Sequence, residues 1–275
     1  MQPWQPDNPF DFTGHTALVT GGAGALGGEM AAALVTHGAD VIVVDVREPP
    51  DALWQRLRAG PGRVAYACAS VADRQALAAV AEQAAEGLGT PDLLLNVAGL
   101  HAPQATTGEA QPLFDLPEEA VRLVLDVNLV GTILACQVFG RAMAARGTGA
   151  IVNISSVSSF RSLTRVPAYS ASKAAVNNFT RWLAVHMAQE YSPRIRVNAI
   201  APGFILTDLN RSLLTEGDGA LTERGRAVLA HVPMARFCAP DELVGTVLWL
   251  LSPASSYVTG VVVPVDGGFT AYSGV

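Results

Sequence analysis

The sequence predicts an α/β fold: a doubly wound parallel sheet of about seven strands with helices on both faces, forming a single Rossmann-like domain. Short apolar runs alternate with helical segments along the whole chain, which is typical of repeated strand–helix–strand units. Val41–Val46 is apolar on both faces, as expected for a strand inside a parallel sheet. The right-handed crossover rule then gives the doubly wound arrangement.

The predicted elements follow one another in that alternation. The strands are short apolar runs, expected at Thr16–Thr20, Val41–Val46, Arg63–Ala67, Asp92–Val97, Ala150–Ile154, Arg194–Ile200 and Val261–Val265. The helices are longer Ala-rich or amphipathic segments, expected at Gly24–His37, Arg74–Leu88, Glu118–Arg146, Ala168–Glu190 and Asp241–Leu251. Gly38 follows the first helix, where a residue without a side chain can adopt the left-handed conformation that ends a helix.

Two stretches lie outside this alternation. Residues 1–10 are rich in Pro and Gln and predict a flexible tail, so the single domain is expected to span residues 11–275. Residues 206–237 follow the sixth strand and contain the Gly-rich tip Glu216–Ala220. Ligands of such sheets bind at the carboxyl ends of the strands. We therefore expect this long polar insertion to be a substrate lid.

Composition excludes several classes of protein. The chain has 24 acidic and 18 basic residues and a net charge of −6, which argues against nucleic-acid binding. We expect no membrane span, because no run of about 18 residues is uninterruptedly apolar. Three well-separated cysteines and the lack of a secretion signal predict a cytoplasmic protein. No cluster of His, Cys and carboxylate residues suggests a metal site.

A glycine-rich segment joins the first predicted strand to the first helix. Glycines there allow a tight turn, and the amides of the helix N-terminus can bind a pyrophosphate. The expected contacts come from Gly21, Gly22, Gly24, Ala25, Leu26 and Gly27. Asp45 ends the next strand, and a carboxylate there accepts hydrogen bonds from the adenosine ribose and repels a 2′-phosphate. NAD is therefore favoured, while Arg47 keeps NADP possible.

Tyr169 and Lys173 are four residues apart on a predicted helix, which places them on one face. A nearby ammonium favours the phenolate and lowers the pKa of a tyrosine, which then can act as an acid or base near neutral pH. Ser156 ends the fifth strand and can hold a substrate oxygen beside the tyrosine.

Five motifs together resemble the short-chain dehydrogenase/reductase family over about residues 11–270. They are T-G-G-A-G-A-L-G from Thr20, N-V-A-G from Asn96, N-I-S-S from Asn153, Y-S-A-S-K from Tyr169 and P-G-F-I-L-T from Pro202. The resemblance implies that Tyr169 is the acid/base, that Lys173 lowers its pKa and binds the nicotinamide ribose, and that Ser156 polarises the substrate carbonyl. It assigns to Asn128 the organisation of a water in a proton relay.

The same resemblance implies further cofactor contacts. They are expected at Val46, Ser70, Val71, Asn96, Ala98, Gly99, Tyr169, Lys173, Pro202, Gly203, Ile205 and Thr207. Two positions depart from the family pattern. Ala25 stands where a second loop glycine is usual, which questions the conformation of that turn, and Ser70 stands where an Asp usually receives the adenine amino group.

The second half of the chain more narrowly resembles a sugar-acid branch, the D-mannonate oxidoreductases, which implies reduction of the keto sugar acid fructuronate. Candidate ligands for such an anionic polyol are Ser158, Arg161, His101 and Arg211, with Arg165 as a further candidate. A guanidinium can bind a carboxylate in a bidentate fork, although each arginine can also be a solvated surface residue.

Two other functions stay open at this point. One is a dehydrogenase of another polyol or of a neutral alcohol or ketone, and the other is a nucleotide-sensing protein that keeps the fold without turnover. The resemblance also implies a homo-oligomer, a tetramer or dimer, built on the two long helices and the C-terminal segment.

Overall fold

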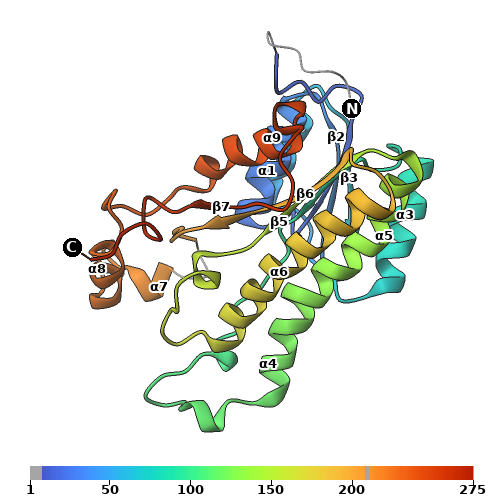
Figure 1. Ribbon diagram of the computed structural model, residues 1–275. Helices are drawn as coiled ribbons and strands as arrows, with labels where there is room; N and C mark the ends of the chain where they lie inside the picture. The colour runs from blue at the N-terminus through green and yellow to red at the C-terminus, as the bar shows by residue number, and fades with distance from the viewer. Residues whose placement is uncertain (1–7, 208–210, 275) are drawn as a thin grey trace.

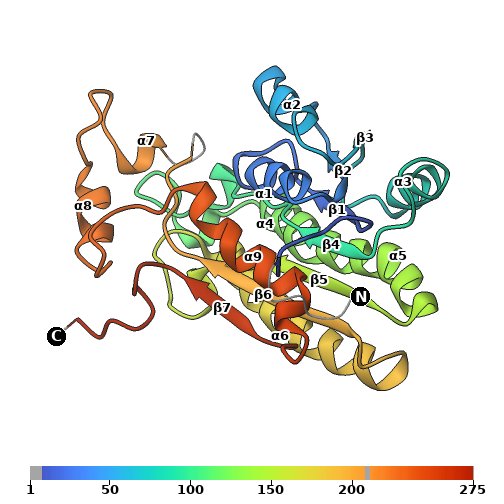
Figure 2. The same cartoon turned by 90° about the horizontal axis from the view of Figure 1, so that it is seen from above.

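The computed structural model describes residues 8–207 and 211–274, without the side chains of residues 212 and 213. Its centre is a seven-stranded parallel sheet in the order β3-β2-β1-β4-β5-β6-β7, which Figure 2 shows across the molecule. The strands are β1 (Thr16–Thr20), β2 (Asp40–Asp45), β3 (Val64–Cys68), β4 (Leu93–Asn96), β5 (Gly149–Ile154), β6 (Ile195–Pro202) and β7 (Val262–Val265). Every predicted strand is confirmed to within two residues at each end.

Helices cover both faces of the sheet (Figure 1). One face carries α1 (Ala25–Thr36), α2 (Asp51–Arg58) and α9 (Val244–Leu251), and the other carries α3 (Arg74–Glu86), α5 (Gly131–Arg146) and α6 (Pro167–Glu190). Leu34, Leu57 and Leu250 pack against the first face. Leu77 and Phe139 pack against the second. The doubly wound prediction is confirmed.

The remaining helices are short. They are α4 (Glu118–Leu125), α7 (Arg211–Leu214) and α8 (Glu223–Leu229), together with single 3-10 turns at Pro103–Ala105, Leu113–Asp115, Val157–Ser159, Pro240–Leu243 and Pro253–Ser255. The insertion at residues 206–237 contains two of these helices, α7 and α8. Figures 1 and 2 show both helices beyond the carboxyl ends of β6 and β7. The sequence reading also missed α2, in which Leu57 is the only buried residue.

The expected helix from Glu118 to Arg146 is continuous but not uniform. A π-helical segment, Asp126–Val130, joins α4 to α5. By length and composition this run of helix could cross a membrane. It packs as a core helix instead, since Phe139 and Met143 of α5 are buried in the cluster beneath the sheet.

The ends of the domain agree with local sequence signals. Gly38 follows α1 with φ +93°, and its amide donates to Val35 O while the next amide, of Ala39, donates to Leu34 O. These two bonds form the expected left-handed helix end. At the N-terminus, Phe10 packs against the core cluster, so the ordered domain begins earlier than residue 11. The rest of the expected tail, residues 1–7, lies outside the described residues.

Candidate active site

The parallel sheet brings the predicted motifs to one edge. In the strand register, Thr20 pairs with Asn96, Asn96 with Asn153, and Ile154 with Ile200. The glycine-rich loop, the segment after β4, the serines after β5 and the segment after β6 therefore begin side by side. This edge is where ligands bind in open parallel sheets.

The glycine-rich loop leaves no room for side chains at two positions. Gly21 has φ +65°, and a Cβ there would lie 2.7 Å from Ala98 Cα. A Cβ on Gly27 would overlap the carbonyl oxygen of Gly21. Ala25, in contrast, is exposed at the first position of α1 and does not have a positive φ. The departure at Ala25 therefore replaces no glycine that this turn requires.

The start of α1 fits a bound pyrophosphate. Gly24 is its N-cap and supplies no side-chain hydrogen bond, and the first turn holds no acidic residue. The amides of this turn and the positive end of the helix dipole are thus available to an anion. Asp45 lies beside the loop, where one carboxylate oxygen accepts from Ala23 N (3.1 Å) and the other from Arg47 N (3.1 Å). This donor and acceptor set suits a dinucleotide.

Other predicted cofactor residues lie nearby with different orientations. Ser70 follows β3, and its hydroxyl accepts from Ala72 N (3.3 Å). Val71 is buried against Gly131 at the start of α5. Val46 is 62% exposed just past the end of β2. Pro202 ends β6, and Gly203, Ile205 and Thr207 follow it, with Ile205 bridged to Cys238.

The side chain of Asn96 does not face the ligand edge. Its amide donates to Asn153 Oδ1 (2.9 Å) and contacts Cys136 Sγ (3.3 Å) on α5. It is a buried cross-link between β4, β5 and α5, so a cofactor contact by this side chain is not supported. The neighbouring amides of Val97 and Ala98 both donate to Thr20 Oγ1 (3.2 Å), which fixes the segment against β1.

Tyr169, Lys173 and Ser156 meet as predicted. Lys173 Nζ lies 5.8 Å from the centroid of the Tyr169 ring and donates to Ile154 O (2.8 Å). Ser156 lies close enough to the Tyr169 phenol to lower its pKa through hydrogen bonding. The Ser156 oxygen also accepts from Ser158 N (3.2 Å), which fixes the rotamer of its side chain. The phenol and the serine hydroxyl can therefore hold one substrate oxygen between them.

The pKa values in this trio are governed by burial. Burial raises the pKa of Tyr169, and its hydrogen bond with Ser156 lowers that pKa by a smaller amount. Burial also lowers the pKa of Lys173 from 10.5 to about 8. Desolvation of the phenol has the largest effect on the pKa of Tyr169, and the expected lowering of that pKa by Lys173 remains a prediction.

Asn128 lies in the π-helical segment and is completely buried. Its Oδ1 accepts from Leu100 N (2.8 Å), and its Nδ2 donates to Leu100 O (3.0 Å) and to Ser172 Oγ (3.0 Å). The hydroxyl of Ser172 in turn donates to Tyr169 O (2.7 Å). Asn128 thus ties the turn after β4 to the first turns of α6. Its expected contact with a relay water remains a prediction.

Two residues complete this arrangement. A Cβ on Gly99 would lie 3.3 Å from both Asn128 Oδ1 and Lys173 Nζ, so the glycine lets these two groups approach the same turn. The sequence predicts Gly99 as a site residue but does not predict Ser172. The signal was its position three residues after Tyr169, on the same helix face.

The four residues predicted to bind the substrate have different surroundings. Ser158 is buried beside Ser156, and its hydroxyl has no hydrogen-bond partner among the residues that the structure describes. The His101 ring meets the Tyr169 ring edge-on, with centroids 6.2 Å apart. Arg161 is exposed and donates to Thr270 O (2.8 Å), which directs it to the C-terminal segment. Arg211 begins α7 and is exposed, next to residues outside the description.

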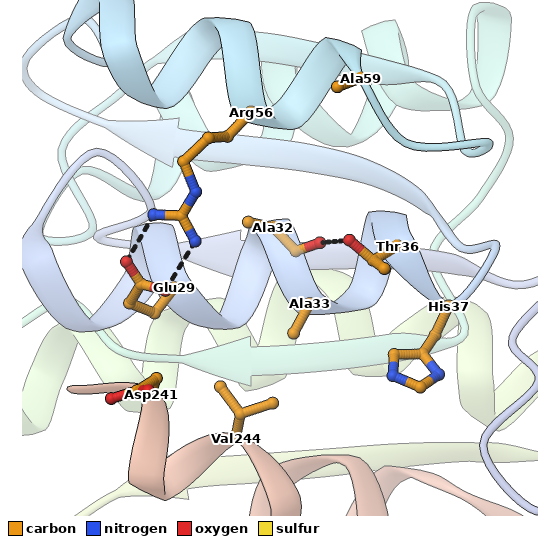
Figure 3. Close-up of a pocket in the computed structure, with 9 residues that line it drawn as sticks. All are labelled: Glu29, Ala32, Ala33, Thr36, His37, Arg56, Ala59, Asp241 and Val244. Atoms are coloured by element: carbon orange, nitrogen blue, oxygen red, sulfur yellow. Dashed lines mark hydrogen bonds and ion pairs between the residues drawn. The ribbon is translucent and has the colours of Figure 1, made fainter. Parts of the chain in front are cut away.

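A separate pocket of the described chain contains none of these residues. A pocket of about 480 Å³ lies between α1, α2 and the start of α9 (Figure 3). Its most polar feature is the paired hydrogen bonding of Arg56 to Glu29, at 2.6 and 2.7 Å. None of the catalytic set lines this pocket.

Fold and site together define a class of protein: an oxidoreductase that uses a nicotinamide dinucleotide and a Ser–Tyr–Lys set at the carboxyl edge of a doubly wound sheet. Comparison with known proteins agrees. A family model described as enoyl-(acyl carrier protein) reductase matches residues 21–270. An uncharacterized oxidoreductase, UxuB of Bacillus subtilis, is 43% identical over 275 residues, covering 96% of this chain and 98% of that protein.

Other relatives have more informative names. Cis-4-hydroxycyclohexanecarboxylate dehydrogenase of Sinomonas cyclohexanicum is 35% identical and covers 94% of this chain and 98% of its own length. A provisionally named D-mannonate oxidoreductase from Haemophilus influenza, solved with NAD, has a TM-score of 0.90 and 36% identity, with 96% of this chain and 98% of that one covered. A provisionally named 2-deoxy-D-gluconate 3-dehydrogenase from Agrobacterium tumefaciens, solved with NADP, has a TM-score of 0.83 and 33% identity, covering 96% and 100%.

The chain therefore belongs to the short-chain dehydrogenase/reductase family. It is an NAD(P)-dependent oxidoreductase that acts on the CH–OH group of alcohols. The alternative of a nucleotide sensor without turnover loses its support, since the acid/base set is complete and assembled.

Proposed function

We propose that this enzyme interconverts a hydroxy acid and its keto acid, with a sugar acid of the D-mannonate/fructuronate type as the substrate. The observation that carries the proposal is the assembled trio of Ser156, Tyr169 and Lys173 beside the ionisable ring of His101. Two of the relatives have names that refer to hydroxy acids, which supports a carboxylate-bearing substrate.

The roles of the residues in reduction follow from their placement. A nicotinamide dinucleotide, when bound at this edge of the sheet, would supply the hydride for the new C–H bond. The Tyr169 hydroxyl donates its proton to the carbonyl oxygen, while Ser156 donates a hydrogen bond to the same oxygen. Lys173 Nζ lies 5.8 Å from the centroid of the phenol ring and, when protonated, stabilises the phenolate that remains. In the direction of oxidation the phenolate takes the proton back.

We further propose that NAD is the preferred cofactor, that Pro202, Gly203, Ile205 and Thr207 contact it, and that residues 206–237 close over the substrate. Asp45 supports the cofactor preference, since its carboxylate repels a 2′-phosphate. Free cysteines at positions 68, 136 and 238 accord with a cytoplasmic protein. A homo-oligomer is proposed as well, with α6 as its interface.

The test is an absorbance assay of NADH and NADPH oxidation with fructuronate, other keto sugar acids, neutral ketoses and simple ketones. We expect keto sugar acids to have the highest kcat/KM, and NADH to exceed NADPH. A preference for neutral apolar ketones would overturn the substrate class.

Replacing Tyr169 with Phe should leave NADH binding nearly intact and lower turnover by about 10²- to 10⁴-fold, the usual value of general acid catalysis. Unchanged turnover in Tyr169→Phe would defeat the mechanism.

A further inference from the structure

His101, Arg165 and Arg224 belong to three separate segments that contact one another near Tyr169. The His101 ring contacts the Tyr169 ring edge-on, and His101 Nε2 is hydrogen-bonded to Thr106 Oγ1 (3.1 Å). Arg224 of α8 reaches back to the loop before α6, where its guanidinium donates to Thr164 Oγ1 (3.2 Å) and Thr164 O (3.4 Å). Arg165 is the next residue of that loop.

These segments are held together by further bonds. Thr107 N donates to Arg165 O (2.9 Å), which connects the loop after β4 to the loop before α6. The insertion is attached to the same place through Arg224. Helix α8 and the loop after β4 are therefore both hydrogen-bonded to Thr164 and Arg165, which precede Tyr169 in the chain.

The positive charges of these basic side chains repel one another. Arg224 lowers the pKa of His101, and Arg165 lowers the pKa of Arg224, in each case after a larger lowering by burial. The ion pairs found in the part of the chain that the structure describes involve other arginines, so neither Arg165 nor Arg224 has a carboxylate partner there. Like charges kept close without an internal counter-ion favour an external anion.

The backbone at Arg165 gives an independent indication. Arg165 has φ +75°, a left-handed conformation that a residue with a side chain rarely adopts. Such strain persists where the surroundings impose it, and it collects at ligand-binding sites. Here the hydrogen bond from Thr107 fixes the carbonyl of Arg165, and Arg165 lies close enough to Arg224 for its charge to lower the pKa of Arg224.

We propose that Arg224 and Arg165 bind the carboxylate of the substrate, at the far end of a chain whose reacting carbon lies at Tyr169. The inference rests on the proposed function and specifies its binding site. His101 lies next to the phenol and is close enough to Arg224 to feel its charge, so it adjoins the hydroxyl-bearing carbons between the two ends. The site thus selects keto acids in which several carbons separate the carbonyl from the carboxylate. Arg224 belongs to the lid, so binding the carboxylate also holds the lid closed.

The test compares Arg224→Gln with Arg226→Gln, a matched control on the same helix. Arg226 is exposed, and among the described residues its side chain donates only to Leu221 O (2.6 Å). For Arg224→Gln, the ratio of kcat/KM for fructuronate to that for a neutral ketose should fall about 10- to 100-fold, the usual effect of losing a charge-assisted hydrogen bond. Arg224→Lys, which keeps the charge, should recover part of the ratio, and Arg226→Gln should preserve it. An equal loss for both substrates in Arg224→Gln, or no loss, would overturn the proposal.

A binding measurement separates this site from the proposed function. Gluconate, an acid that cannot be reduced, is titrated calorimetrically into the NADH-loaded enzyme and into both glutamine variants. Weaker gluconate binding in Arg224→Gln alone supports the site even if the enzyme turns over only neutral ketoses, in which case the proposed function fails and the site stands. Turnover of keto sugar acids with gluconate binding unchanged in Arg224→Gln would retain the function and reject the site.

Discussion

Lys173 is the only lysine among the 275 residues of the chain, and it lies almost fully buried in the catalytic trio. The other 17 of the 18 Lys and Arg residues are arginines. An arginine would not serve at this position, because it remains charged at any accessible pH and its planar fork is larger than an ammonium. The burial of Lys173 therefore affects both the free energy of unfolding and the proton transfer at Tyr169.

The pKa of Lys173 can be measured without interference. Lysine carrying ¹³C at Cε would give a single side-chain resonance, and we expect it to titrate near pH 8 rather than near 10.5. The cause is desolvation, which disfavours the charged ammonium. A midpoint close to 10.5 in the ligand-free enzyme would contradict the burial of this side chain.

The same shift has a consequence for stability with a definite sign. Between pH 8 and 10.5 the unfolded chain binds more protons at Lys173 than the folded protein does, so the free energy of unfolding rises with pH in that window. The full difference amounts to about 3 kcal/mol. In Lys173→Met this contribution is absent. Urea unfolding of both proteins should show that the free energy of unfolding of the parent rises relative to that of the variant from pH 8 to 10. A difference that does not change with pH would contradict the prediction.

At the scale of elements, the turn between β1 and α1 depends on the closest backbone packing in the site. Gly27→Ala would push a methyl group into the carbonyl of Gly21, so the helix start must move. We expect a loss of about 1–3 kcal/mol in the free energy of unfolding and weaker NADH binding, because the helix amides no longer meet at the pyrophosphate. Urea unfolding and fluorescence titration measure the two effects.

Gly245→Ala is the control for that substitution. Gly245 is an exposed residue of α9 with open space where its Cβ would lie. Alanine there should leave NADH binding unchanged and stabilise the protein by about 0.5–1 kcal/mol, the difference in helix propensity. If Gly27→Ala bound NADH as tightly as the parent, the loop geometry described above would be wrong.

The elements also show how far the sequence predicts this structure. The strands were predictable because each is a short apolar run, and the inner strands are buried on both faces. Helix α2 was not, because only Leu57 is buried and the rest of its pattern matches a polar loop. The Ser156, Tyr169 and Lys173 set was predictable from helical spacing and motif order. Arg224 was not, since nothing in a polar insertion shows which arginine turns inward, and the raised pKa of Tyr169 arises only from tertiary burial.

At the scale of the whole molecule, α6 has an aromatic outer surface that one chain leaves exposed. Phe179, Trp182 and His186 stack along the helix, with centroids 6.2 and 4.8 Å apart, and Tyr191 meets His186 edge-on. Trp182 and Val185 are each 56% exposed. A contiguous apolar surface of this kind is typical of a protein–protein interface. It lies on one of the two helices through which the family resemblance implies oligomerisation.

We therefore expect Trp182→Arg to dissociate the oligomer. A buried interface tryptophan usually contributes about 2 kcal/mol or more to binding, and a two-fold axis places the substitution in the interface twice. Light scattering after size-exclusion chromatography should show a smaller mass for the variant, with the far-ultraviolet circular dichroism of the parent. Tyr257→Arg is the comparison, since Tyr257 is fully exposed on the turn before β7. If Tyr257→Arg dissociates the assembly and Trp182→Arg does not, the copies meet at the C-terminal side of the sheet and the aromatic surface of α6 has another role.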